Sequence, residues 1–144
     1  MDESADRELD AILNLIKMTQ DGVVKWYAIK PRGDLIENES TKYSNVMYCT
    51  YMDKRLRLYI EHKRIDRPSG INQLVRLAFL ESTEQTYPYW VTNVVLEISN
   101  AEGQSLWRFP SKPATKDLLD AAKYQIAGVK DILDSLIQGS AESA

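Results

Sequence analysis

The chain of 144 residues contains one cysteine, Cys49, and one histidine, His62. A single cysteine cannot form a disulfide within the chain, which excludes the small secreted domains that disulfides hold together. A closed zinc site needs four ligands, so a Cys/His zinc centre is excluded as well. Cys49 lies in an apolar run rich in β-forming residues, where a free cysteine usually packs as a small hydrophobic side chain. We therefore expect Cys49 in the core rather than as a nucleophile paired with His62.

Glycine and long apolar runs are also scarce. The six glycines are scattered along the chain, so it has neither a P-loop nor a dinucleotide-binding loop. The longest uninterrupted apolar runs span only a few residues, whereas a membrane-spanning helix needs about 18 or more. The acidic start, residues 1–6, differs from the basic and then apolar start of a signal peptide. The sequence thus predicts a cytoplasmic protein with no cofactor, no metal and no membrane partner.

Positive charge is not in excess. Eighteen Lys and Arg residues stand against 21 Asp and Glu residues, for a net charge of −3, which disfavours nucleic acid as a partner. With 44% hydrophobic residues, a chain of this length can bury one core without disulfides or metals. We expect a single domain over residues 6–138, between a disordered N-terminus (1–5) and a disordered C-terminal tail (139–144).

Two segments carry helical periodicity. Residues 6–20 place apolar side chains at i, i+3, i+4 and i+7, which predicts an amphipathic helix with Ser4 as its N-cap. A second helix is predicted over about residues 113–138, with Gly139 at its end. Its apolar seam consists of Leu118, Leu119, Ala122, Ile126, Val129, Ile132, Leu133, Leu136 and Ile137. We expect this seam to dock on a sheet; pairing with a second copy or with a partner helix is the alternative.

The middle of the chain carries β patterns. Strands are predicted over residues 23–30, 46–52, 55–65, 91–99 and 104–109. Tight turns are predicted at Asp53-Lys54 and at residues 100–103, and a polar surface connection over residues 35–44. Residues 71–80 fit both a strand and a helix; we favour a strand, and the topology depends on this choice. These elements predict an α+β domain, with a mostly antiparallel sheet of five or six strands flanked by an N-terminal and a long C-terminal helix.

A basic cluster lies in and around the predicted strand 55–65. Residues 53–67 hold six Lys and Arg residues against three acids. Apolar residues alternate with polar ones along this strand, so we expect one buried and one wet face. The wet face carries the candidate anion-binding residues Arg55, Arg57, Tyr59 and Lys63, with Arg64 beside them. The alternative, which we favour, is a solvated face whose charges prevent edge-to-edge aggregation.

Tyrosine and tryptophan are abundant, with eight and three residues against two phenylalanines. Both types carry a polar atom on an aromatic body, which suits interfaces. The tyrosines in or beside predicted loops and hairpins are Tyr43, Tyr48, Tyr51, Tyr87 and Tyr89. They form either a recognition surface or ordinary half-buried sheet positions. Trp26 and Trp107 are expected to pack in the core between sheet and helix.

The sequence contains no recognisable catalytic constellation. The leading hypothesis is therefore a non-catalytic cytoplasmic interaction module, an adaptor or chaperone-like protein. It would bind a protein partner or form a homodimer through sheet-face aromatics and the basic strand. The alternative is a sensor for a small anionic ligand such as a nucleotide, and a third hypothesis is an enzyme of unrecognised type. The candidate binding residues are Tyr48, Tyr51, Arg55, Arg57, Tyr59, Lys63, Arg64, Tyr87 and Tyr89.

Overall fold

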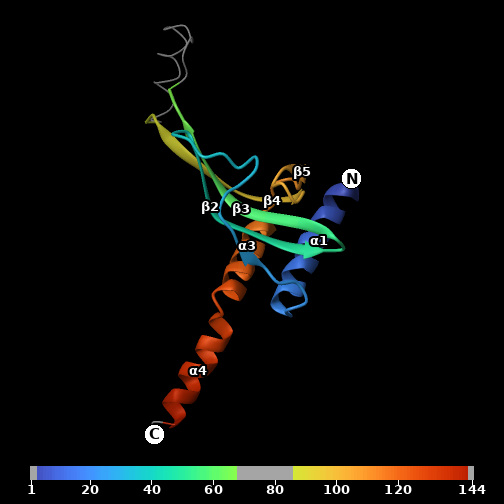
Figure 1. Cartoon of the computed structure of the whole chain (residues 1–144), viewed down its shortest axis with the longest axis vertical. Helices are drawn as coiled ribbons and strands as arrows, with labels where there is room; N and C mark the ends of the chain where they lie inside the picture. Colours follow the sequence, from blue (N-terminus) through green and yellow to red (C-terminus); the bar gives the residue numbers. More distant parts are fainter. Residues whose placement is uncertain (1–2, 68–85, 143–144) are drawn as a thin grey trace.

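The computed structural model describes residues 3–67 and 86–142 (Figure 1). In this part of the chain the helices are α1 (Glu3–Gln20), α3 (Pro113–Ile126) and α4 (Val129–Glu142). The strands are β1 (Tyr27–Ala28), β2 (Thr41–Tyr51), β3 (Lys54–Ile65), β4 (Tyr89–Ser99) and β5 (Ser105–Arg108). They form one sheet in the order β1-β2-β3-β4-β5, and all neighbours are antiparallel. The predicted α+β class with a mostly antiparallel sheet of five or six strands is confirmed, with five strands in the described residues. The choice between strand and helix for residues 71–80 lies outside the described residues.

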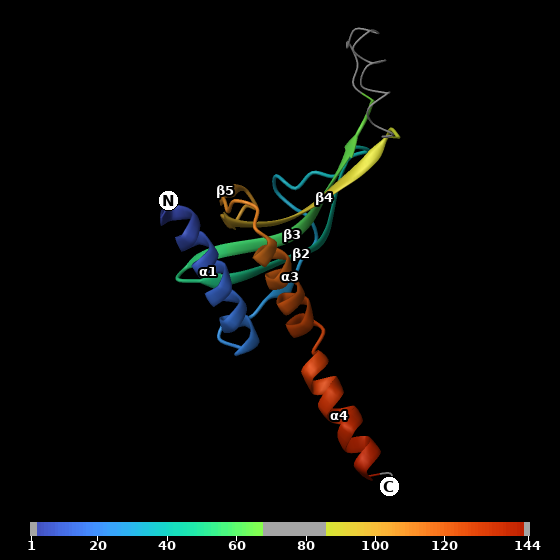
Figure 2. The same ribbon diagram turned by 180° about the vertical axis from the view of Figure 1, so that it is seen from behind.

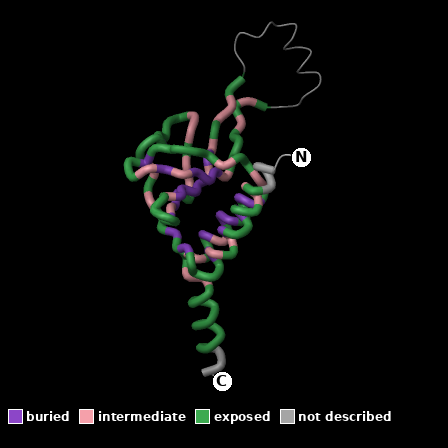
Figure 3. The backbone as a smooth tube through the Cα atoms, turned by 90° about the vertical axis from the view of Figure 1, so that its right-hand side faces the viewer, coloured by how far each residue is buried: buried purple, intermediate pink, exposed green. Residues whose placement is uncertain are grey.

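Helices α1 and α3 lie on the same face of the sheet (Figures 1 and 2). The main core lies between these helices and the sheet, where Figure 3 shows the buried positions. Its buried residues are Ile12, Leu15, Val24, Trp26, Met47, Cys49, Leu56, Leu58, Leu96, Ala114, Leu118, Leu119 and Ala122. Each fully buried aliphatic side chain stabilises the fold by about 1.5–3 kcal/mol. The predicted N-terminal helix is confirmed, but it begins at Glu3, so Ser4 lies inside the helix and is not its N-cap.

The segment that follows α1 forms less strand than expected. Val24 and Trp26 are both buried, which fits the alternation of the predicted strand 23–30, and Trp26 packs in the core as predicted. Only the two residues of β1, however, pair with β2. The backbone N–H groups before β1 donate to residues of α1 and α3 instead. Val24 N–H donates to Met18 O (3.2 Å), and Trp26 N–H donates to Gln125 Oε1 (2.8 Å).

Strands β2 and β3 form the predicted hairpin, but the turn is shifted. Strand β2 begins at Thr41, within the segment 35–44 that was expected to be a surface connection. The turn residues are Met52 and Asp53, with φ of 51° and 62°, rather than Asp53-Lys54. Two consecutive left-handed residues are typical of a type I′ turn, whose twist matches that of the two strands. Because neither residue is glycine or asparagine, the sequence pattern placed the turn one residue too late.

The hairpin of β4 and β5 around residues 100–103 is confirmed. The prediction that Trp107 packs in the core is wrong, because this side chain is 45% exposed. It lies on β5, an edge strand of the described sheet, all of whose residues are exposed. The indole packs edge-on against Phe109, with the ring centroids 4.7 Å apart.

The predicted C-terminal helix consists of two helices. Gly128 adopts a φ of +65° and its N–H donates to Gln125 O (3.1 Å), which ends α3. Helix α4 then runs away from the sheet (Figures 1 and 2) and continues through Gly139, where an end was expected, to Glu142. The α3 half of the apolar seam packs in the core as expected. The α4 half does not, since it lies beyond the sheet, where the described chain offers it no surface.

A strap, defined as residues 29–40, crosses the face of the sheet opposite to the helices. It is held at the β4–β5 turn, where Asp34 N–H donates to Gly103 O (3.0 Å). Within the strap, Leu35 is buried against the sheet, so the prediction of a polar surface connection over residues 35–44 is wrong here as well. The apolar cluster on this face consists of Leu35, Val46, Tyr59 and Val95. The sheet is therefore covered on both faces in its middle.

Candidate functional site

The face of β3 that was expected to be wet is buried in its middle. Arg57, Tyr59 and Glu61 are at most 7% exposed, because the strap and its apolar cluster lie over this part of the sheet. Only the two ends of the face reach solvent, with Arg55 half-buried and Lys63 exposed. The alternation of residues along β3 predicts which side chains share a face, but it does not tell what covers that face.

The Arg57 cluster consists of Arg57, Asp34 and Glu97 together with the carbonyl group of Gly103. Arg57 Nε donates to Glu97 Oε1 (2.7 Å), Nη1 donates to Gly103 O (2.8 Å) and Nη2 donates to Asp34 Oδ1 (2.6 Å). Burial works to lower the pKa of Arg57, but the hydrogen bonds and charges of the two carboxylates outweigh burial, so this pKa is raised. All three guanidinium nitrogens are engaged, which leaves Arg57 unavailable to an external anion.

Asp34 connects the strap to this cluster and to β5. Its Oδ2 accepts a hydrogen bond from Ser105 N–H (2.7 Å), while Oδ1 accepts from Arg57. Burial works to raise the pKa of Asp34, but the hydrogen bond from Ser105 and the guanidinium of Arg57 lower this pKa by more. The strap is therefore clamped to the sheet by a carboxylate that is ionised at neutral pH.

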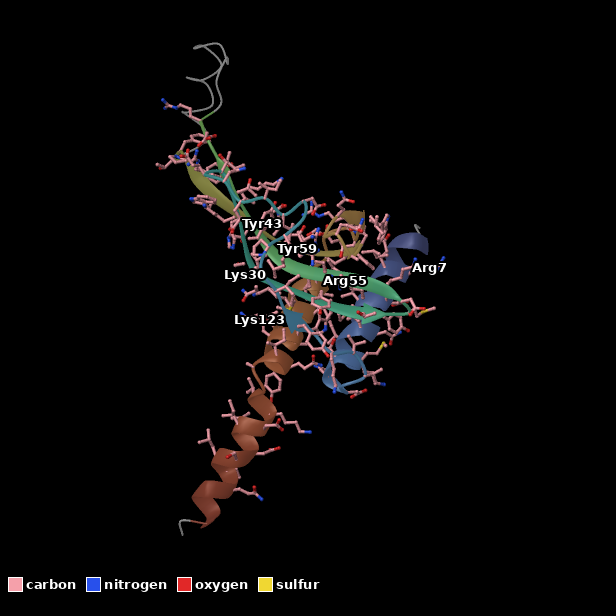
Figure 4. The ribbon with its side chains drawn as sticks, in the orientation of Figure 1. Arg7, Lys30, Tyr43, Arg55, Tyr59 and Lys123 are labelled. Atoms are coloured by element: carbon pink, nitrogen blue, oxygen red, sulfur yellow. The ribbon has the colours of Figure 1, made fainter. Side chains whose placement is uncertain are left out.

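Tyr59 and Tyr43 lie beside the Arg57 cluster. Their rings meet edge to face, with the centroids 5.5 Å apart (Figure 4). Burial and then the charge of Glu97 raise the pKa of Tyr59, and burial and then Glu61 raise the pKa of Tyr43. Both phenols are neutral at physiological pH and serve as packing partners on this face of the sheet.

The Arg55 stack consists of Arg55, Tyr48 and Tyr27. The guanidinium carbon of Arg55 lies 4.4 Å from the centroid of the Tyr48 ring, and the Tyr27 ring lies 5.6 Å from that of Tyr48. A cation–π contact of this kind contributes about 0.5–1 kcal/mol at an exposed site. Arg55 forms no ion pair with a described residue. Its charge is thus not neutralised by a described carboxylate.

Four further candidate residues, Lys63, Arg64, Tyr87 and Tyr89, lie at or beside the far ends of β3 and β4. Arg55 and Lys63 are eight residues apart on one strand, which corresponds to about 26 Å. Lys63 and Arg64 each form an ion pair with a nearby carboxylate. The rings of Tyr87 and Tyr89 are 5.5 Å apart and tilted. This group is thus separated from the Arg55 stack by most of the length of the sheet.

Tyr51 is on the helix-covered face of the sheet. It lines an apolar groove of about 490 Å³ between α1 and the β2–β3 turn, together with Met18, Leu56 and Phe109. The candidate binding residues therefore occupy four separate places: the Arg55 stack, the buried middle of β3, the far ends of β3 and β4, and this groove. The structure does not bring them together into one site.

A second groove, of about 540 Å³, lies where α1, α3 and α4 meet. Asp117, Asp120 and Asp131 line it. Within residues 3–67 and 86–142, however, no group of three or more His, Cys, Asp or Glu side chains is arranged to hold a metal ion. Acidity alone does not make this groove a ligand site.

Cys49 is expected to be inert toward thiol reagents in the folded protein. The side chain is fully buried, and burial raises its pKa to about 12, so both access and the reactive thiolate are lacking near pH 8. A colorimetric disulfide reagent should modify no thiol in the native protein and one thiol in guanidinium chloride. Modification of the native protein at the rate of the denatured protein would contradict the burial of Cys49.

The α4 stripe consists of Val129, Ile132, Leu133, Leu136 and Ile137. These positions follow the i, i+3, i+4, i+7, i+8 spacing of one helical face. Ile132, Leu133, Leu136 and Ile137 are 54%, 46%, 65% and 69% exposed, and α4 is exposed over residues 130–139 (Figure 3). Contiguous apolar surface of this kind is uncommon on soluble monomers and marks interaction sites.

Asp34 and Glu97 are structurally important residues that the sequence patterns did not identify. A signal for Glu97 was present, because an acid and a base between apolar residues of neighbouring strands must pair if both are buried. Asp34 had no such signal, since it lies in a polar turn segment. For the α4 stripe the signal was Gly128, which interrupts the apolar seam of the C-terminal helix.

No helix in the described part of the chain has the length and apolar character needed to cross a membrane. No protein-family model, curated protein sequence or solved structure matches the chain. Its function is accordingly inferred from the geometry of its own surfaces.

Proposed function

We propose that the chain is a non-catalytic protein-interaction module whose docking element is the α4 stripe. The observation that supports this function is the exposure of an apolar face along α4, a helix that runs away from the sheet. A helix of 14 residues is only marginally stable in water when nothing covers it. A partner that covers α4 removes apolar surface from water and stabilises the helix at the same time.

The proposed docking surface lies on α4 and not on the sheet, where the sequence patterns predict it. Arg57 and Tyr59 are buried and held within the fold, so they do not serve a partner directly. The anion-sensor alternative rests on Arg55, Lys63 and Arg64, which lie near opposite ends of β3. Arg55 and Lys63 are about 26 Å apart along this strand, and we therefore rank the sensor below the interaction module.

The test is photo-crosslinking in the cells that make the protein. A photoreactive apolar amino acid is placed at Leu136 in the α4 stripe or, as a matched control, at Ile36 in the strap, because these side chains are 65% and 68% exposed. We expect protein adducts from position 136 only. Adding Leu133→Asp should abolish them, since burying an unpaired charge opposes docking.

Circular dichroism of the Leu133→Asp variant controls for folding. Leu133 is half-exposed on α4, so the substitution should leave the thermal unfolding of the sheet and the two core helices unchanged. Position 136 giving no adducts, or giving no more than position 36, would contradict the proposed function.

A further inference from the structure

The charged residues beside the α4 stripe are distributed unequally. Successive residues of a helix are about 100° apart, so Lys130 and Asp134 lie along one edge of the stripe. Within residues 129–139, the other edge carries Ser135 and Gly139 and no charge. Neither Lys130 nor Asp134 forms an ion pair with another described residue. One edge of α4 therefore presents a positive and a negative charge, one turn apart, to whatever covers the stripe.

Helix direction decides which edges meet. In two helices packed antiparallel about a twofold axis, like edges face each other, whereas in a parallel pair opposite edges face each other. Antiparallel pairing of two α4 helices sets Lys130 of each copy against Asp134 of the other. Parallel pairing places both charges against the uncharged edge, where they form no ion pair between the helices.

We infer that the occupant of the α4 stripe is the α4 helix of a second copy of this chain, packed antiparallel with the twofold axis near Ile132. This inference rests on the proposed function and names its partner. The stripe supplies the same aliphatic side chains on both sides of the interface, and the edge charges are complementary to themselves. A second copy thus covers the apolar face and pairs with the charges of the edge at the same time.

The last turn of α3 enlarges this interface. Pairing centred near Ile132 brings the end of the second α4 alongside the end of α3, where Ile126 of the apolar seam is 38% exposed. This addition matters because specific, stable interfaces bury about 1,200–2,000 Å² in total, and two helices of 14 residues lie at the small end of that range. We accordingly expect a dimer that dissociates on dilution.

The test exchanges the two edge charges in the full chain. A charge-reversed chain (Lys130→Asp with Asp134→Lys) keeps both pairs when it binds itself, but it sets like charges against each other when it binds the native chain. Native mass spectrometry of a mixture of unlabelled native chain and ¹⁵N-labelled charge-reversed chain should show both homodimers and few mixed dimers. The single variants Lys130→Asp and Asp134→Lys should each weaken their own homodimer about tenfold, because exposed charge pairs contribute a few tenths of a kcal/mol each and two pairs change sign.

The outcomes separate the inference from the proposed function. If mixed dimers make up half of all dimers, as random pairing gives, antiparallel pairing is overturned. A photo-adduct from position 136 should map near Gly128 of the second copy. An adduct at Met18 or Phe109, in the apolar groove of the second copy, would also overturn antiparallel pairing. A protein that stays monomeric while position 136 crosslinks to a different protein would overturn the second copy as partner and leave the interaction module standing. A monomer without any adduct would overturn both.

Discussion

Replacing Arg57 by methionine is expected to lower the free energy of unfolding by about 3–5 kcal/mol. Arg57 is 1% exposed, and its guanidinium donates hydrogen bonds to two carboxylates and a carbonyl group. Methionine fills much of the same volume but leaves Glu97, itself 2% exposed, as an unpaired buried charge. Chemical denaturation monitored by tryptophan fluorescence measures the loss.

The double variant Arg57→Met with Glu97→Leu separates charge from packing. Removing both partners should cost less than removing Arg57 alone, because a buried ion pair can often be replaced by apolar residues with little loss, whereas a single orphaned charge is strongly destabilising. Arg55→Met is the matched control on the same face of β3, where only a cation–π contact worth about 0.5–1 kcal/mol is lost. A single Arg57→Met variant within 1 kcal/mol of the Arg55→Met control would contradict the role of the Arg57 cluster.

Gly33→Ala is expected to destabilise the protein by about 3 kcal/mol. Gly33 has a φ of +64°, and a Cβ atom there would lie 2.1 Å from Gly103 O. The left-handed backbone costs about 1–2 kcal/mol for a residue with a Cβ, and forcing atoms into a packed contact adds about 1–3 kcal/mol. The strap would have to lift off the β4–β5 turn, which also loosens Asp34 from Arg57 and Ser105. Thermal and chemical unfolding measure the total effect.

Gly22→Ala is the control for the backbone contribution. Gly22 has a similar φ of +76°, but nothing lies within 4 Å of its added Cβ, so this variant should lose only about 1–2 kcal/mol. Amide NMR shifts of Asp34 and Ser105 should move in Gly33→Ala and stay in place in Gly22→Ala. Equal losses in both variants would show that the strap is not seated on Gly103.

Local patterns in the sequence were sufficient for the fold class. The helical spacing of Leu9, Ile12 and Ile16 and the alternation around Leu56 and Leu58 both depend only on neighbouring residues. Such patterns predict α1, the β2–β3 hairpin and the β4–β5 hairpin, and the structure contains all three. They also place Cys49 and Trp26 in the core, where they are buried.

The strap could not be predicted in the same way. Its position depends on the contact between Gly33 and Gly103, which are 70 residues apart in the sequence. Composition alone marks residues 35–40 as polar and exposed, although Leu35 is buried. Without the strap, the charged face of β3 is expected to be wet, and Arg57 is a candidate for anion binding. A long-range backbone contact therefore turned a candidate binding residue into a structural one.

The C-terminal helix shows a different limit of sequence patterns. The periodicity from Leu118 to Ile137 correctly predicts one apolar stripe, but it contains no information on how far the sheet extends beneath that stripe. The part of the helix that packs on the sheet ends at Gly128, whose φ of +65° breaks the helix. A glycine in the middle of the predicted helix is the point at which the chain leaves its own core.

Hydrogen exchange of the α4 amides at increasing protein concentration tests the central claim most directly. A lone helix of this length opens easily and exchanges quickly, whereas a paired one is protected. We expect residues 129–142 to gain protection as the concentration of the full chain rises, while protection of α1 and α3 stays constant. Protection of α4 that does not change with concentration, or rapid exchange at every concentration, would contradict self-association through the α4 stripe.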